Sequence, residues 1–99
     1  MIFTQCGRNN KYPMKVETWR RGEPIPDWIT DNCKIVGMEG DRLIPWYREV
    51  SAGGYEIVKT DGSSLISTKS ITDYVCLGDG KIFSLTETQI GLLYKPLEK

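Results

Sequence analysis

The chain has no histidine among its 99 residues, and this absence excludes much enzyme chemistry at the outset. Imidazole is the usual proton shuttle, the commonest metal ligand and the base of serine and cysteine triads. Hydrolases built on such triads are therefore excluded.

Cysteine is scarce as well. Cys6, Cys33 and Cys76 are an odd number at wide spacing and contain no C-x-x-C pair. This pattern predicts neither a disulfide framework nor a tetrahedral zinc site, so we expect reduced thiols, no metal and no cofactor. Cys76 falls in an apolar, strand-like pattern and is the thiol expected to be buried.

Long apolar runs are also missing. The longest apolar stretches, such as Tyr74–Leu77 and Gln89–Tyr94, are far shorter than the roughly 18 residues that a membrane-spanning helix needs. The opening residues lack the apolar segment of a signal peptide. We therefore expect no membrane association and a location in the cytoplasm.

Carboxylates are present without an arrangement that suggests catalysis. Asp41, Asp61 and Asp79 fall in predicted turns, and Asp27 falls at a predicted helix start, where such residues are favoured for structural reasons. The segment Asp61-Gly62-Ser63-Ser64 lacks the glycine spacing and the strand-to-helix context of a phosphate loop. No catalytic residue is predicted, and the chain is not expected to be an enzyme.

The formal charge is zero, but the charges are unevenly distributed. Residues 1–21 carry five basic side chains against one acidic side chain, and the rest of the chain carries eight against twelve. Domains that bind duplex DNA usually show a clear basic excess, so duplex DNA is not an expected partner.

What the chain does contain is aromatic residues beside arginines. There are three tryptophans and five tyrosines. Exposed aromatics beside arginine are typical of interaction hot spots, and guanidinium groups also bind phosphate. The predicted ligand- or partner-binding residues are Trp19, Arg20, Arg21, Trp46, Tyr47 and Arg48. The alternative is a set of solvated side chains on an edge strand, with Trp46 or Tyr47 packed inward, because alternation places these two on opposite faces.

Turn and periodicity signals predict the first half of the fold. Residues 1–11 are expected to be a flexible, irregular segment before one globular domain over residues 12–99. Alternation over Met14–Arg20 predicts a half-buried strand with Val16 and Trp19 on opposite faces. Pro26 suits the first turn of a short helix over residues 26–32. Two strands, 34–39 and 42–50, surround a Gly40-Asp41 turn, and Pro45 predicts an edge strand or a bulge.

The second half of the chain is predicted to be mostly hairpins. Strands 55–60 and 65–69 form one hairpin, and strands 74–77 and 81–85 form another around an Asp-Gly turn. Thr86 and Gln89 match a capping box, which predicts a last helix over residues 87–94. The predicted fold class is α+β: a small single domain with a twisted, mostly antiparallel sheet of five to seven short strands and one or two short helices.

Three segments carry a family resemblance. Residues 71–85, followed by Ile90 and Tyr94, resemble small bacteriophage and prophage proteins that share a GDYI-like hairpin motif and an F-x-x-x-Y ending. Residues 11–19 and 25–29 look like the K-x-P-V-x-V-E-A opening and the P-x-W-[IL] segment of the same group. These motifs consist of turn and core residues, so the resemblance implies a shared fold. Most members have no assigned function, and no site is carried over.

The resemblance and the lack of catalytic groups together lead to a functional expectation. The chain is expected to be a phage-encoded, non-enzymatic accessory protein that acts by binding in the host cytoplasm, as an inhibitor of host defence. It would bind either a host protein surface or a small phosphorylated ligand, the latter as a nucleotide sponge at an oligomer interface. The alternative is a minor phage structural or assembly protein that works through edge-strand self-association.

Overall fold

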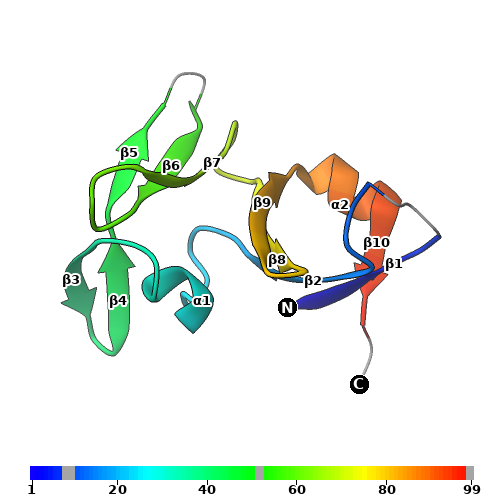
Figure 1. Cartoon of the computed structure of the whole chain (residues 1–99), viewed down its shortest axis with the longest axis horizontal. Helices are drawn as coiled ribbons and strands as arrows, with labels where there is room; N and C mark the ends of the chain where they lie inside the picture. The colour runs from blue at the N-terminus through cyan, green and yellow to red at the C-terminus, as the bar shows by residue number, and fades with distance from the viewer. Residues whose placement is uncertain (8–10, 51–52, 98–99) are drawn as a thin grey trace.

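The computed structural model describes residues 1–7, 11–50 and 53–97 (Figure 1). The fold is small and rich in strands, which are mostly antiparallel, and the described residues include two short helices. The predicted abundance of antiparallel strands is confirmed. The strands do not form the expected single sheet, however, but divide into sheets of five, two and three strands.

The five-stranded sheet joins the two ends of the chain. Its strand order is β10 (Tyr94–Pro96), β1 (Ile2–Gln5), β2 (Lys15–Trp19), β8 (Tyr74–Gly78) and β9 (Lys81–Leu85), with antiparallel pairing throughout. The predicted hairpin over residues 74–85 is confirmed. Its turn places Asp79 at φ 52° and Gly80 at φ 75°, the left-handed conformations that a tight two-residue turn requires.

The prediction of an irregular segment over residues 1–11 is wrong for its first part. Strand β1 lies between β10 and β2, and Phe3 is buried in the core. The Gln5 side chain donates hydrogen bonds to the carbonyls of Tyr12 (3.0 Å) and Pro13 (3.2 Å). The polar residues that suggested a loop thus take part in strand pairing and in side-chain hydrogen bonds. Residues 8–10 of that prediction lie outside the described residues.

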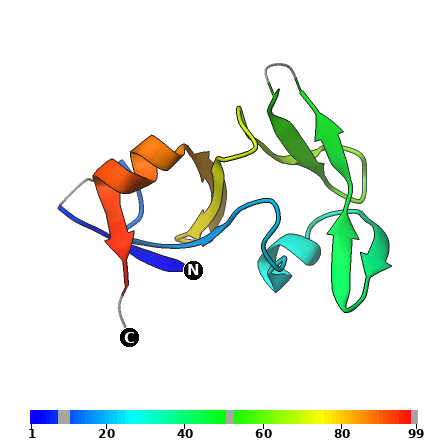
Figure 2. The ribbon, with the colours of Figure 1, turned by 180° about the vertical axis from the view of Figure 1, so that it is seen from behind.

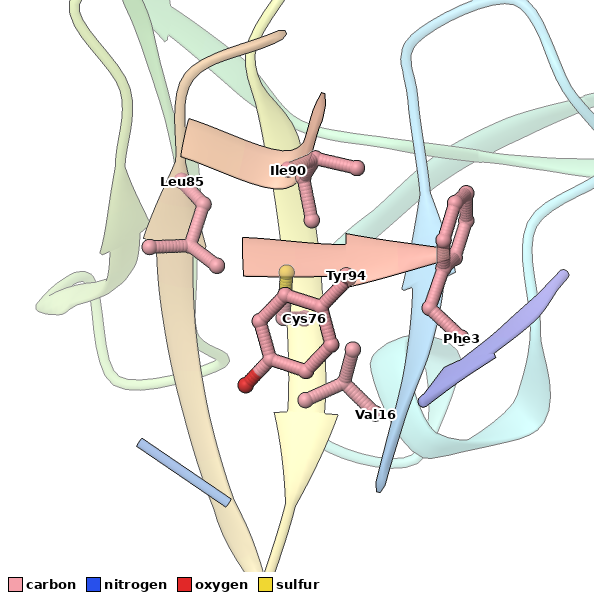
Figure 3. Close-up of a cluster of buried hydrophobic side chains, with 6 residues drawn as sticks. All are labelled: Phe3, Val16, Cys76, Leu85, Ile90 and Tyr94. Atoms are coloured by element: carbon pink, nitrogen blue, oxygen red, sulfur yellow. The ribbon is translucent and has the colours of Figure 1, made fainter. Parts of the chain in front are cut away.

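One face of the five-stranded sheet is covered by α2 (Glu87–Leu93) and by the tyrosine that follows it (Figure 3). The predicted capping box is confirmed: the backbone N–H of Gln89 donates to Thr86 Oγ1 at 3.1 Å, and the backbone N–H of Thr86 donates to Gln89 Oε1 at 2.9 Å. The chain then continues into β10, a strand that was not predicted. This first core consists of Phe3, Val16, Cys76, Leu85, Ile90 and Tyr94.

The opposite face of the same sheet is covered too. Here α1 (Asp27–Thr30) and the three-stranded sheet of β5 (Tyr47–Glu49), β6 (Tyr55–Val58) and β7 (Ser64–Ser67) pack against β2 and β8. This second core consists of Trp19, Ile29, Cys33, Tyr55, Ile57 and Val75. The prediction of a half-buried strand is confirmed for Val16 and Thr18, which are buried, with Lys15 exposed on the other face. It is wrong for Trp19, which lies on that other face and is only 2% exposed.

The remaining hairpin projects from the part of the molecule that lies away from both termini (Figures 1 and 2). It consists of β3 (Ile35–Glu39) and β4 (Arg42–Pro45), paired around the predicted Gly40-Asp41 turn. The predicted effect of Pro45 is confirmed, since β4 is an edge strand. After Pro45 the chain leaves this sheet and enters β5.

The three thiols are free, with Cys33 and Cys76 buried and Cys6 exposed. The predicted burial of Cys76 is confirmed, and burial raises the pKa of its thiol to about 12. Among the described residues, no helix is long and apolar enough to cross a membrane.

Candidate functional site

The structure brings three of the six predicted binding residues together where the five-stranded and three-stranded sheets meet. The rings of Trp19 and Tyr47 stack with their centroids 6.4 Å apart and an interplanar angle of 4°. Tyr55 meets the edge of Tyr47 at 5.5 Å and 90°. The guanidinium carbon of Arg21 lies 4.4 Å from the Tyr47 centroid and 5.4 Å from that of Tyr55. We call these four residues the aromatic–arginine cluster.

A tight turn after β2 places Arg21 in this cluster. The backbone N–H of Glu23 donates to the carbonyl of Arg20 at 3.1 Å, and Gly22 adopts φ 105°, which a side chain would disfavour. The indole N–H of Trp19 donates to the carbonyl of Glu23 at 3.0 Å. The buried indole thus anchors the turn that holds Arg21 over the tyrosine rings.

Burial divides the cluster into a hidden part and an accessible part. Trp19 and Tyr55 are buried, Tyr47 is half-buried and Arg21 is exposed. The prediction that Trp19 is a surface anchor is therefore wrong, because its ring belongs to the second core. What remains accessible is Arg21 and part of Tyr47, at the rim of a hollow of about 250 Å³ lined by Arg21, Gly22, Glu39, Leu43, Ile44, Pro45 and Tyr47.

Arg20 points away from the cluster, although it was predicted to act with Arg21. Its guanidinium lies 4.6 Å from the centroid of Tyr74, a ring that packs against the first core. Its Nη1 donates to Glu87 Oε2 of α2 at 3.1 Å. Arg20 therefore connects the sheet to α2, and the two neighbouring arginines do not converge on one ligand.

Trp46 and Arg48 lie on either side of Tyr47 and have partners of their own. Trp46 is 38% exposed, and Lys34 Nζ lies 4.4 Å from the centroid of its ring. Arg48 forms an ion pair with Glu56 across the ladder between β5 and β6. The prediction that Trp46 and Tyr47 differ in exposure is confirmed.

The charge at the rim of the hollow comes from Arg21 and Glu39. Burial, followed by the proximity of Tyr47, raises the pKa of Tyr55, so this phenol adds no charge to the site. No group of three histidine, cysteine or acidic side chains is placed to hold a metal ion in the described part of the chain. The site thus offers one cation, one carboxylate, an aromatic face and apolar walls.

Comparisons with family models, curated proteins and solved structures find no match. The geometry of the site is therefore the basis of the proposed function.

The sequence analysis did not identify Tyr55 and Lys34, which complete the contacts of Arg21 and Trp46. Each belongs to a segment distant in sequence from its partner, so no local pattern pointed to it.

Proposed function

We propose that the protein is a non-enzymatic binding protein that docks on another protein through the hollow beside Arg21 and Tyr47. The observation that carries this proposal is the exposed guanidinium held 4.4 Å over a half-buried tyrosine ring at the rim of that hollow. Arginine and tyrosine are enriched in binding hot spots. Side chains already held in place lose less conformational entropy when a partner binds.

The walls of the hollow favour a protein side chain over a phosphate group. Leu43, Ile44 and Pro45 provide apolar surface, and the carboxylate of Glu39 would repel an anion. Recognition of phosphate favours converging guanidinium groups, yet Arg20 and Arg48 are each paired with a glutamate elsewhere. We therefore favour a partner that inserts an apolar or aromatic side chain beside Arg21.

The proposed function also includes the origin of the protein and the cellular component on which it acts. The GDYI-like motif of residues 71–85 supports a bacteriophage origin, as part of a resemblance that runs through residues 11–19 and 25–29. On this basis we propose that the protein acts in the host cytoplasm and restrains a component of host defence. A host protein is then the expected partner.

The test is capture from an extract of phage-infected bacteria on the immobilised full chain. The wild type and Arg48→Ala should retain the same host protein, because Arg48 lies outside the hollow. Arg21→Ala and Leu43→Glu should lose it, since the first removes the cation at the rim and the second places a charge on an apolar wall. Thermal unfolding of each variant checks that the fold is kept.

Two outcomes would overturn the proposal. One is retention of the same host protein by both hollow variants. The other is release of a phosphorylated compound on heating the wild type, identified by mass spectrometry, and its loss when Arg20→Ala is combined with Arg21→Ala. The second result would establish the nucleotide-sponge function instead.

A further inference from the structure

The projecting hairpin leaves the outer edge of β3 open. In a hairpin closed by a two-residue turn, the flanking pair, here Glu39 and Arg42, exchanges backbone hydrogen bonds. The next pair, Met38 and Leu43, therefore directs its N–H and C=O groups outward, away from the ladder. No bond to the outward groups of Met38 occurs within the described residues. In both views β3 is the outermost strand of its part of the molecule (Figures 1 and 2).

Three other strand edges are blocked by a proline or by a neighbouring strand, and β3 has neither. The outer edge of β10 includes Pro96, and that of β4 includes Pro45, neither of which has an N–H to donate. The outer edge of β9 is approached by β7, where Ser84 Oγ donates to the carbonyl of Ser67 at 3.2 Å. Natural sheets often block edges by such means, so an edge without a proline or a covering strand suggests a partner.

The side chains of β3 add apolar surface at this open edge. Val36 is 57% exposed and Met38 is 64% exposed. Leu43 on the neighbouring strand and Trp46 beyond it are exposed as well. A partner strand on β3 would satisfy the outward backbone groups and cover part of this apolar surface.

We propose that the partner strand is β3 of a second copy of this chain, paired antiparallel about a two-fold axis. The charges along the strand fit this arrangement. Lys34 precedes β3 and Glu39 ends it, and both are exposed. An antiparallel copy can place Glu39 of one chain opposite the partner's Lys34, and the two-fold axis repeats the pair at the other end.

The backbone hydrogen-bonding groups of β3 also fit the register that places Glu39 opposite the partner's Lys34. The ladder between β3 and β4 is irregular between Ile35 and Gly37, so the strand has one extra residue at this point. Lys34 directs its backbone N–H to Val58 and its C=O to Trp46, so the backbone groups of the next residue, Ile35, point to the outer edge, as those of Met38 do on the other side of the irregularity. The proposed register brings Met38 opposite the partner's Ile35, so that outward groups meet. The other edge of each hairpin is β4, where Pro45 has no N–H to donate to a further strand. The assembly therefore stops at a dimer.

The test is the mass of the full chain in solution, measured by sedimentation velocity from about 10 µM to about 1 mM, the range for a weak contact. We expect a concentration-dependent monomer–dimer equilibrium. Glu39→Lys and Lys34→Glu should each raise the dimer dissociation constant roughly tenfold or more, because like charges would face each other at both ends. An equimolar mixture of the two variants should recover the dimer, since opposite charges again face each other.

Glu49→Lys is the matched control, because it makes the same charge change at an exposed position of β5. It should dimerise like the wild type. A monomeric wild type over the whole range, or a mixture of the two charge variants that pairs no better than each alone, would overturn the proposal. Glu39 also lines the hollow, so Arg21→Ala is used to separate the two proposals. This variant should abolish capture of the host protein and leave the mass of the chain in solution unchanged, so failure of dimerisation is distinguishable from failure of the proposed function.

Discussion

At the scale of single residues, Trp19 shows how burial decides a role. Its neighbours in sequence are arginines, which suggested a binding surface, yet its ring lies between the five-stranded sheet and Tyr47. The indole N–H is satisfied by the carbonyl of Glu23. Trp19 therefore packs against Tyr47 from within the core and is not itself accessible to a partner.

We predict that Trp19→Ala lowers the free energy of unfolding by about 3–5 kcal/mol, the usual cost of truncating a buried aromatic side chain. Urea denaturation of both proteins measures this difference. Trp46→Ala is the control, because Trp46 is 38% exposed, and its effect should be clearly smaller. Equal losses for the two variants would contradict the placement of Trp19 in the core.

A second residue-scale prediction concerns Cys76. Burial raises the pKa of its thiol from 9.0 to about 12, so in the folded protein it stays protonated at pH values where the unfolded chain ionises. The stability that this provides is fully present below pH 9 and is lost as the pH rises above 9 towards 12. The free energy of unfolding should therefore fall more steeply between pH 9 and pH 11 in the wild type than in Cys76→Ala.

Denaturation series at several pH values measure these slopes. Cys6→Ala is the matched control, because Cys6 is exposed and its removal should leave the wild-type slope unchanged. Identical slopes for the wild type and Cys76→Ala would contradict the burial of this thiol.

At the scale of elements, α2 depends on its capping box. The helix has only seven residues, so the hydrogen bonds at its first turn form a large share of its stabilisation. We predict that Thr86→Ala lowers the free energy of unfolding by about 1 kcal/mol, because the backbone N–H of Gln89 loses its acceptor. Denaturant melts measure this loss. Thr88→Ala, at an exposed position inside the same helix, should cost nothing, and a loss as large as that of Thr86→Ala would contradict the role of the cap.

Sequence predicted the elements whose signals are local. The Gly40-Asp41 and Asp79-Gly80 turns and the Thr86 cap each lie within a few residues of what they organise, and all three were confirmed. The terminal strands β1 and β10 were missed because they stabilise each other across almost the whole chain, with Phe3 paired to Pro96. No local pattern encodes such a pairing.

The candidate site, too, could be predicted only where its signals are local in sequence. Alternation correctly separated Trp46 from Tyr47, because that rule concerns adjacent residues of an extended chain. It could not show that β2 is covered on both faces, which buries Trp19. Nor could it show that Glu87 takes up the charge of Arg20, since this contact arises only when α2 packs beside the sheet, or that the register of β5 and β6 places Glu56 opposite Arg48.

At the scale of the whole molecule, the five-stranded sheet lies between two cores. This sheet, which contains both terminal strands, fills one half of the molecule with α2, and the other half holds the three-stranded sheet, α1 and the projecting hairpin (Figures 1 and 2). Among the described residues of the basic first 21 positions, Arg20 and Arg21 do not converge on one basic surface. Arg20 and Arg21 diverge to opposite sides of the sheet, which favours a docking surface of mixed character over an electrostatic one.

The central claim is that the hollow beside Arg21 contacts another protein. Its most direct test is photo-cross-linking in bacteria that produce the full chain with a photoreactive amino acid at one position. Leu43 lines the hollow, and Leu92 is 75% exposed on α2, away from it. We predict that a probe at position 43 cross-links to a host protein, that Arg21→Ala abolishes this adduct, and that a probe at position 92 gives none. The same adduct from both positions, or no adduct with a host protein from position 43, would contradict the claim.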